Sequence, residues 1–445
     1  MKDTPTNDTD RIKQMVNDLL AEAKRQGASS AEAGVSMSEG LSVTVRMGDV
    51  ETVEHTRDKG LGVTVYFDHR KGSASTTDFG AEAVRETVEA ACRIARYTAE
   101  DNCAGLADAA LMAEEIPDLD LHHPWDLEPD AAVELALEAE DAARDCDQRI
   151  TNSEGATVSR HEGGQVYGNS HGFLGSFRGT RHSVSCAVIA EDESGMQRDY
   201  WYTSGRVPAD LEPPAAVGKM AAQRTVQRLS PRKLETSAVP VIYAAEAATG
   251  LFGHLIAGIR GGNLYRKASF LLDSLGKPVF PEGMRIHEQP HLPRALGSAP
   301  FDGEGVATIA RDLVVDGVLQ GYVLNSYSAR KLGMETTGNA GGVRNLTVDG
   351  GEQDLAALLK TMGTGLLVTE LIGMGVNTVT GDYSRGVAGF WVEQGEIQYP
   401  VQEITVAGNL RDMFMGIRAV GSDVERRGNI RTGSVLIEGM TVAGG

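Results

Sequence analysis

The sequence predicts an α+β protein: an N-terminal antiparallel sheet with helices, followed by a β-rich C-terminal domain that is barrel- or sandwich-like. A helical apolar period at the start gives way to two-residue alternation. With 53 glycines, 15 prolines and 5% aromatic residues, the composition favours many tight turns between short strands. A chain of 445 residues exceeds the usual size of one core. We place the domain boundary near residue 232, giving domains 1–232 and 233–445.

The N-terminal segment begins with a helix and continues as strands. Apolar residues from Ile12 to Ala23 recur at helical spacing, and Gly27 follows them as a helix-ending residue. Apolar residues then alternate with polar ones through residue 65, which predicts an antiparallel meander. Its expected turns are the pairs Glu39-Gly40, Gly48-Asp49 and Lys59-Gly60.

The rest of the first domain repeats this order. A second helix is expected to open at Thr77 or Asp78, and a third to follow Pro129 and run to about Cys146. Strands are predicted between residues 150 and 204, with turns at 153–155, 162–164 and 193–195. A helix opened by Pro213-Pro214 and ended by Ser230-Pro231 leads into a linker up to residue 238.

The second domain is predicted to be mostly short strands. It opens with an apolar strand, Val239 to Ala244, and a helix from Glu246 to about Ala257. Asp316-Gly317 separates two apolar runs, 311–315 and 318–324, which is a strong hairpin signal.

Charge and composition exclude several classes of function. A net charge of −20 repels a nucleic-acid backbone, so nucleic acid is not an expected partner. No run approaches eighteen apolar residues and the polar N-terminus lacks an apolar signal segment, so we expect no membrane association and a cytoplasmic location. The four cysteines form no CxxC pair and are expected to be reduced thiols.

One motif points to a metal. His287-Glu288-Gln289-Pro290-His291 spells HExxH, which in zinc peptidases lies on a helix so that both imidazoles share one face. Pro290 disfavours the α conformation of the residue before it, and Pro281 and Pro293 flank the motif. We therefore expect an extended loop, with the histidines as surface or interface groups.

Two long stretches carry a resemblance to a known family. They are LFGHLIAGIRGGNLYRKASFLLDSLGKPVFP (251–281) and GSAPFDGEGVATIARDLVVDGVLQGYVLNSYSARKLGMETTGNAGG (297–342). Both resemble the TldD/TldE (PmbA) peptidases, also called modulators of DNA gyrase, and specifically the TldE/PmbA branch. The resemblance implies a cytosolic metalloprotease of two related chains enclosing a cavity in which unfolded or extended peptides are cleaved.

The resemblance also implies where zinc belongs. In the TldD branch the metal is held by an HExxxH on a helix and by a cysteine near the C-terminus. The corresponding helix here begins Ala245-Glu246, and Gly250 occupies the second histidine position. No cysteine follows Cys186, and the segment 431–434 offers only hydroxyls. We therefore expect no metal in this chain and zinc in a TldD-type partner.

Several residues are candidates for contact with a peptide. Asn263, Tyr265 and Arg266 are expected on a loop that forms part of the cavity wall, and an equally open interpretation is a salt-bridged surface turn. Asp302 and Glu304 lie two residues apart on a glycine-flanked turn. They could act in acid/base work, bind a cation or cap local amides, and capping is favoured. Tyr327 lies in a segment that could present hydroxyls to a peptide or simply begin a helix. His254 is expected to be a packed or interface histidine.

The function expected from these observations is that of a TldE/PmbA-like subunit without metal ligands of its own, paired with a TldD-like chain. No catalytic residue is assigned. Two alternatives stay open at this point: a homodimeric peptide-binding protein without protease activity, and an autonomous metallopeptidase that uses His287 and His291.

Overall fold

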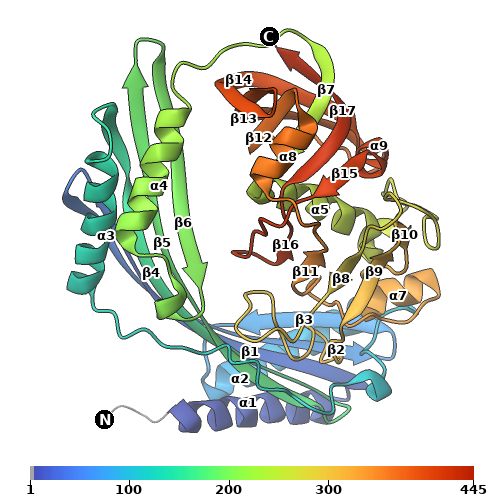
Figure 1. Ribbon diagram of the computed structural model, residues 1–445. Coiled ribbons are helices and arrows are strands. Elements are labelled where there is room, and N and C mark those ends of the chain that lie inside the picture. The colour runs from blue at the N-terminus through green and yellow to red at the C-terminus, as the bar shows by residue number, and fades with distance from the viewer. Residues whose placement is uncertain (1–4, 445) are drawn as a thin grey trace.

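The computed structural model describes residues 5–444 and confirms the α+β class (Figure 1). The N-terminal half builds one six-stranded antiparallel sheet in the order β3-β2-β1-β4-β5-β6. Its helices are α1 (Pro5–Arg25), α2 (Ala81–Tyr97), α3 (Pro129–Arg144) and α4 (Pro214–Gln227). Its strands are β1 (Ser30–Arg46), β2 (Asp49–Phe67), β3 (Arg70–Thr76), β4 (Ile150–Asn169), β5 (Leu174–Asp192) and β6 (Gly195–Gly205).

The long strands carry two separate helix pairs. Helices α1 and α2 pack on β1 and β2 through one buried cluster that contains Val35, and α3 and α4 pack on β1, β4 and β5 through a second cluster that contains Leu41. Both residues have odd numbers and therefore point to the same face of β1. The strand between them is largely uncovered, because neither helix pair reaches its middle.

The expectation of short strands was wrong for this half. Strand β1 runs through Gly40, β2 through Gly60 and β4 through Gly163, so the predicted turns at these glycines do not exist. At Gly40 a side chain would meet His161 Nδ1 and Thr56 Oγ1 at 3.0 Å, which explains the glycine by close cross-strand approach. The turns at 47–48 and 193–194 do occur, and Gly27 ends α1 with φ 88° as expected. Helix α2 begins at Ala81, a few residues later than expected.

The C-terminal half is β-rich and closes into a barrel-like sheet. Five strands form a closed ring in the order β14-β13-β12-β7-β17, with β17 pairing back to β14, and β15 extends it. The strands are β7 (Ser237–Tyr243), β12 (Gly365–Ile372), β13 (Asp382–Glu393), β14 (Glu396–Asn409), β15 (Ile417–Val420) and β17 (Val435–Gly444). The associated helices are α5 (Ala245–Ile259), α8 (Leu355–Met362) and α9 (Leu410–Met415).

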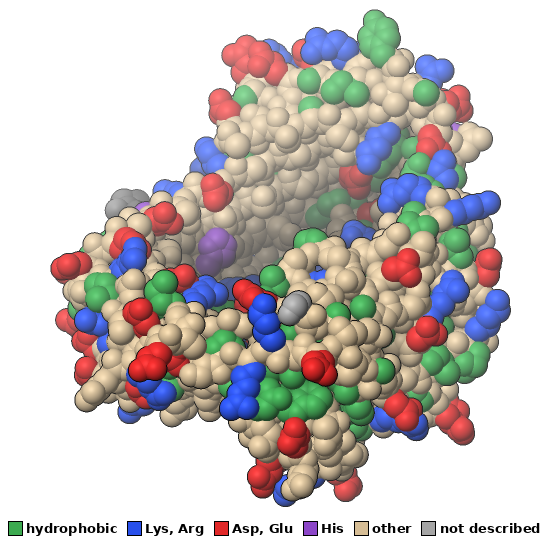
Figure 2. All heavy atoms as spheres, turned by 90° about the horizontal axis from the view of Figure 1, so that it is seen from above, with side chains coloured by type: hydrophobic (Ala, Val, Ile, Leu, Met, Phe, Trp, Pro, Cys, Tyr) green, Lys and Arg blue, Asp and Glu red, His purple; other side chains and the backbone are tan. Residues whose placement is uncertain are grey.

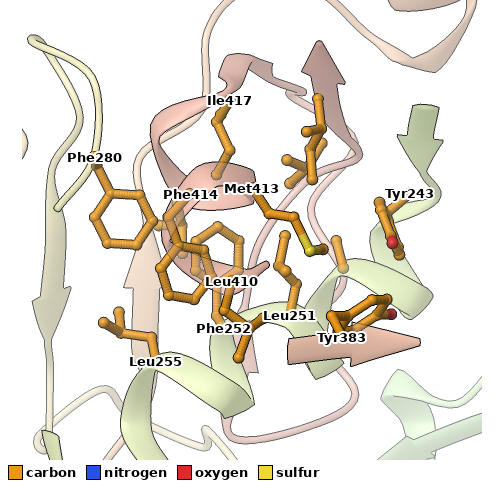
Figure 3. Close-up of a cluster of buried hydrophobic side chains, with 14 of the residues drawn as sticks. Tyr243, Leu251, Phe252, Leu255, Phe280, Tyr383, Leu410, Met413, Phe414 and Ile417 are labelled. Atoms are coloured by element: carbon orange, nitrogen blue, oxygen red, sulfur yellow. The ribbon is translucent and has the colours of Figure 1, made fainter. Parts of the chain in front are cut away.

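A second, smaller sheet lies beside the barrel-like sheet, in the order β10-β9-β8-β11-β16. Its strands are β8 (Ile286–Glu288), β9 (Arg311–Val315), β10 (Val318–Leu319), β11 (Leu346–Val348) and β16 (Ile430–Arg431), with α6 (Gly261–Tyr265) and α7 (Ser326–Leu332) beside it. The predicted hairpin at Asp316-Gly317 is present, and both residues have positive φ as its turn requires. One large core joins the two sheets, with Phe252 of α5 at its centre among Phe280, Phe414 and Leu410 (Figure 3).

The long sheet and the C-terminal half enclose a hollow. Figure 1 shows the helices of the N-terminal half on the outer side of the curved sheet, and Figure 2 shows the recess between the sheet and the C-terminal part from above. The two halves touch on either side of this recess. Arg294 reaches Asp120 at 2.5 Å on one side, and α4 reaches α5 on the other. Within residues 5–444, no helix is both long and apolar enough to cross a membrane.

Candidate functional site

The first turn of α5 is the position at which the family resemblance places the HExxxH segment, and Glu246 occupies the position of its glutamate. Strand β7 enters this turn from the barrel-like sheet, and α5 is anchored because its inner face buries Leu251, Phe252 and Leu255. The backbone N–H of Ala245 donates to Ser434 Oγ at 3.1 Å, and that hydroxyl donates to Asp423 Oδ2 at 2.6 Å. The structure therefore brings the start of α5 and the segment 431–434 together, although they are far apart in the sequence.

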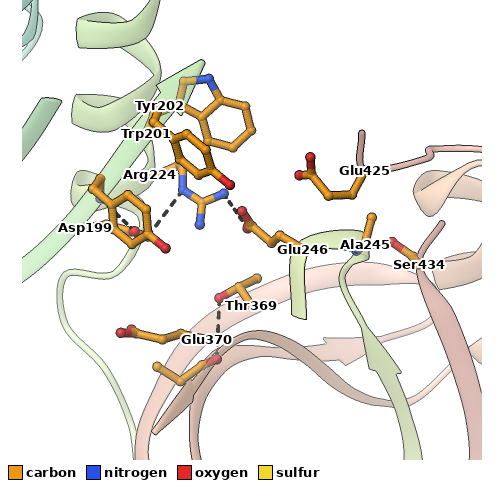
Figure 4. Close-up of polar contacts among 12 residues, drawn as sticks. Asp199, Trp201, Tyr202, Arg224, Ala245, Glu246, Thr369, Glu370, Glu425 and Ser434 are labelled. Atoms are coloured by element: carbon orange, nitrogen blue, oxygen red, sulfur yellow. Dashed lines mark hydrogen bonds and ion pairs between the residues drawn. The ribbon is translucent and has the colours of Figure 1, made fainter. Parts of the chain in front are cut away.

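Glu246 lies beside two arginines. Arg224 Nη1 of α4 donates to Glu246 Oε1 at 2.7 Å (Figure 4). Arg427 Nη2 lies 3.8 Å from Glu246 Oε2. The guanidinium of Arg427 stacks over the rings of Trp201 and Tyr202, at 4.1 and 4.4 Å from their centroids. The carboxylate of Glu246 is thus an ion-pair partner that links β6, α4 and α5.

These contacts continue into a larger cluster. Arg224 and Arg228 both approach Asp199 Oδ2, at 3.4 and 3.5 Å, and Arg228 also contacts Glu370 Oε2 at 2.6 Å. Burial opposes the charge of Arg224, but the carboxylates of Glu246 and Asp199 outweigh it and raise the pKa of this side chain. Arg427 is also paired with Glu425. We call the set Asp199, Arg224, Arg228, Glu246, Glu370, Glu425 and Arg427 the interdomain ion cluster.

The residues at this position do not fit a zinc ion. Ala245 and Gly250 supply no side-chain donor, and Ser434 presents a neutral hydroxyl in place of a thiolate. Glu246 lies against two guanidiniums, which compete for its oxygens. Among the residues that the structure describes, no group of three or more His, Cys, Asp or Glu is arranged to hold a metal.

The HExxH at 287–291 is extended, as expected. His287 and Glu288 are neighbours in β8 and so point to opposite faces, and the motif continues as a turn. His287 Nε2 lies 2.9 Å from Asp349 Oδ1, and His291 Nε2 lies 3.0 Å from Thr308 Oγ1. The two imidazoles therefore have separate partners and share no ligand position, which speaks against the autonomous metallopeptidase.

Glu288 has a structural role that the motif did not suggest. Its side chain is 1% exposed and contacts Arg311 Nε at 3.1 Å and Asn339 Nδ2 at 2.8 Å. Burial raises the pKa of this carboxyl, while Arg311 acts in the opposite direction. The ion pair joins β8 to β9 and to the segment around Asn339.

Asp302 and Glu304 point into the protein. Asp302 accepts hydrogen bonds from the backbone N–H groups of Glu304, Val306 and Ala340 at 2.8 to 3.0 Å, while burial raises the pKa of this carboxyl to about 6. Glu304 accepts from Ser326 Oγ at 2.6 Å. Asp302 also lines a cavity of about 710 Å³ against β1, β2 and β4.

The other four candidate residues surround a second cavity. Asn263, Tyr265, Arg266 and Tyr327 line a pocket of about 360 Å³ between α6 and α7. Tyr265 and Tyr327 form an edge-to-face pair with centroids 5.9 Å apart, and Tyr327 donates to Asp101 Oδ2 at 2.8 Å. The same pocket includes Arg260, which the sequence did not single out.

His254 is half-buried in α5 and packs edge-on against Tyr383, with centroids 6.0 Å apart. Burial lowers the pKa of this imidazole, and Arg385 adds to the effect. Sequence reasoning missed Arg224 and Arg427, which contact Glu246, and Trp201, whose ring packs against both guanidiniums. They lie in α4, in the segment before β16 and in β6, and the one available signal was the aromatic run Tyr200-Trp201-Tyr202.

Three family models match this chain. They are PmbA/TldA metallopeptidase domain 1 over residues 31–95, the central domain over 122–229 and the C-terminal domain over 236–444. A metalloprotease PmbA of Escherichia coli O157:H7 is 56% identical over 425 residues, which covers 96% of this chain and 94% of that protein.

Two proteins of Haemophilus influenzae differ in their similarity. Its metalloprotease PmbA homolog is 52% identical, covering 97% of this chain and 96% of the relative. Its metalloprotease TldD homolog is 21% identical, covering 95% and 91%. Among solved structures, a putative modulator of DNA gyrase from Bacteroides thetaiotaomicron superposes with a TM-score of 0.93 at 28% identity, covering 98% of this chain and 99% of that one.

Proposed function

Because this chain belongs to the PmbA/TldD metallopeptidase family, we propose that it is the metal-free subunit of a two-chain protease. Its partner is a TldD-type chain that carries the zinc, and the pair acts in the cytoplasm on unfolded or extended peptides. The chain contributes the wall of a chamber and limits entry to narrow, extended segments.

The observation that supports this proposal most is the state of Glu246. A catalytic glutamate of a zinc peptidase must face the metal-bound water with a free carboxylate oxygen. Glu246 instead contacts Arg224 and Arg427, and its neighbours Ala245 and Ser434 provide neither imidazole nor thiolate. The side chains at this position therefore supply none of the groups that bind zinc, which fits a structural subunit.

The shape supports the role of a chamber wall. The hollow in Figure 2 lies between the long sheet and the C-terminal half, and the interdomain ion cluster fixes one side of it. A rigid recess is suited to an extended chain, because a folded domain would have to be unfolded before it could enter. The greater similarity to the PmbA homolog than to the TldD homolog of one organism supports the choice of branch.

The first experiment compares each chain alone with the mixture. This chain is purified alone and together with a TldD-type chain, and zinc content, complex mass and cleavage of an unstructured peptide are measured. We expect no stoichiometric zinc and no cleavage from this chain alone, and chelator-sensitive cleavage from the complex. Stoichiometric zinc with chelator-sensitive cleavage by this chain alone would overturn the proposal.

A matched pair of variants assigns the chemistry to one chain. Glu246→Gln in this chain keeps an acceptor for Arg224 and is expected to leave the activity of the complex within about twofold. The same change at the glutamate of the partner's HExxxH is expected to abolish cleavage, because that residue activates the water. Equal losses from both variants would contradict a structural role for Glu246.

A further inference from the structure

The pocket between α6 and α7 is lined by positively charged side chains and by no negatively charged one. It is lined by two arginines, Arg260 and Arg266, and by Asn263, Tyr265 and Tyr327, and no carboxylate is among its lining residues. The protein as a whole carries a net charge of −20, so a cavity with two positive charges and no negative one differs sharply from the average surface. Its volume of about 360 Å³ is enough for one residue of a peptide.

The guanidinium groups of this pocket are not neutralised by the protein. Neither Arg260 nor Arg266 forms an ion pair with any of the residues that the structure describes. The nearby acid Asp101 is already paired with Lys331 at 2.9 Å. Arg266 is positioned by Asn263 Oδ1 at 3.3 Å and by the ring of Tyr265, 5.4 Å from its centroid. A guanidinium held over an aromatic ring keeps its remaining N–H donors free for a ligand.

The walls of the pocket are fixed before any ligand arrives. Gly261 approaches Ser328 so closely that a Cβ would lie 2.4 Å from its Oγ, which allows α6 to pack directly on α7. Asn325 caps α7 through a hydrogen bond from the N–H of Ser328 at 3.0 Å. A pocket whose backbone is already in place loses less conformational entropy on binding a carboxylate than a flexible surface does.

We propose that this pocket binds a carboxylate of the peptide that the proposed protease holds, either the terminal α-carboxylate or an acidic side chain. The inference rests on the proposed function for the peptide nature of the ligand. It gives this subunit a part in substrate selection: it would anchor one negatively charged end or residue while the partner chain cuts elsewhere.

The test uses three short peptides that differ only in their carboxylate. The first is Ac-Ala-Ala-Tyr-Ala with a free C-terminal acid, and the second is the same peptide as C-terminal amide, which has no charge. The third is the amide with glutamate in place of the first alanine. Binding to the full chain is measured by ligand-observed NMR titration at low salt. We expect the free acid or the glutamate peptide to bind roughly tenfold more tightly than the neutral amide. Which of the two binds more tightly identifies the source of the carboxylate.

Variants connect the preference to the pocket. Arg260→Gln and Arg266→Gln, both exposed positions, are expected to remove the preference for the charged peptide and to leave the thermal midpoint unchanged. Arg57→Gln on β2 changes the net charge equally but lies outside the pocket, and it should keep the preference. Equal binding of all three peptides by the wild-type chain, or the same loss in Arg57→Gln as in the pocket variants, would overturn the inference.

Measuring cleavage by the complex with a TldD-type chain, beside peptide binding by this chain alone, distinguishes a failure of this inference from a failure of the proposed function. If the complex forms and cleaves while the wild-type chain binds all three peptides equally, only the carboxylate site fails. If no complex or cleavage is found while the charged peptides bind through Arg260 and Arg266, the site stands and the subunit role fails.

Discussion

Arg224 of α4 donates a hydrogen bond to Glu246 of α5 at 2.7 Å, and this contact joins the two halves of the chain. The donor belongs to the N-terminal helical layer and the acceptor to the helix that leaves the barrel-like sheet. Asp199, 7% exposed, depends on the same guanidinium, so the contact is part of a network and not an isolated surface pair.

Loss of Arg224 should therefore cost stability. Arg224→Ala leaves the buried carboxylate of Asp199 with one charged partner, Arg228, besides the backbone N–H of Tyr200, and we expect a loss of roughly 2 kcal/mol in the free energy of unfolding, measured by urea titration. Arg198→Ala is the matched control. Its partner Glu154 and Arg198 itself are both 46% exposed, so this change should cost under about 1 kcal/mol. Equal losses would show that the interdomain ion cluster adds nothing beyond a surface pair.

The HExxH residues should separate into one structural residue and two dispensable ones. Glu288→Ala leaves Arg311 uncompensated in a buried position and should cost about 3–5 kcal/mol. His287→Ala removes only a contact with Asp349, which is 43% exposed, and should cost under about 1 kcal/mol. A double variant that also removes His291 should leave zinc content and cleavage by the complex unchanged. A fall in either would revive the autonomous metallopeptidase.

Asp302 should give stability a recognisable pH dependence. Its folded pKa is raised from 3.8 to about 6, so the folded state binds the proton more tightly than the unfolded state. The stabilisation from this proton is complete below about pH 4 and is lost as the pH rises through 6. That loss is about 2–3 kcal/mol at 1.36 kcal/mol per pKa unit. In Asp302→Asn this contribution is absent.

The measurement is the stability difference between wild type and Asp302→Asn from pH 4 to 7. The asparagine cannot accept from the N–H of Ala340 with its amide nitrogen, so the variant starts at a disadvantage. This disadvantage should shrink as the pH rises, because only the wild type loses its proton. A difference that is constant with pH would show that the pKa of Asp302 is not raised.

The strand pattern could be predicted from the sequence, and the length of the strands could not. Val35 and Leu41 are apolar at odd positions, so the phase is the same on both sides of Gly40 although Glu39 interrupts it. A phase that is the same on both sides indicates one strand, whereas glycine next to a charged residue indicates a turn, and in β1 the chain continues as one strand. The glycines instead lie where the strands are uncovered by either helix pair, which is a property of the tertiary structure.

For the candidate site too, one part could be predicted from the sequence and another could not. That Ala245 and Gly250 cannot bind a metal was readable from residue types alone. That Glu246 is neutralised by Arg224 and Arg427 was not, because ion pairs between residues far apart in sequence have no local pattern. Asn263, Tyr265 and Arg266 are near in sequence and share a pocket with Tyr327, while Asp302 and Glu304 turn toward backbone and hydroxyl donors.

Two helical glycines should respond oppositely to alanine. In α4, a Cβ at Gly218 would lie 1.9 Å from the carbonyl oxygen of Ala139, so Gly218→Ala must push α3 and α4 apart at a cost of roughly 1–3 kcal/mol. In α5, a Cβ at Gly250 meets only Leu371 Cδ1 at 3.6 Å. Gly250→Ala should therefore stabilise the helix by up to about 1 kcal/mol. The comparison of thermal midpoints checks both, and a stabilising Gly218→Ala would contradict the close packing of the two helices.

The space at Gly250 also allows a direct test of whether the replaced side chains alone account for the missing metal-binding group at this position of the described chain. If only side chains are missing, the triple variant Ala245→His, Gly250→His and Ser434→Cys should bind zinc, because Ala245 and Ser434 are already in contact through the 3.1 Å hydrogen bond. Zinc is measured by mass spectrometry after dialysis, with Ala245→Ser, Gly250→Ala and Ser434→Ala as the triple control. We expect one zinc per chain in the triple variant with histidines and cysteine and none in the triple control.

Cleavage by the zinc-binding variant should still be absent. Arg224 and Arg427 remain in contact with the carboxylate of Glu246, which would have to activate the water. If the triple variant with two histidines and a cysteine binds no zinc, the backbone itself does not have the geometry that the metal requires.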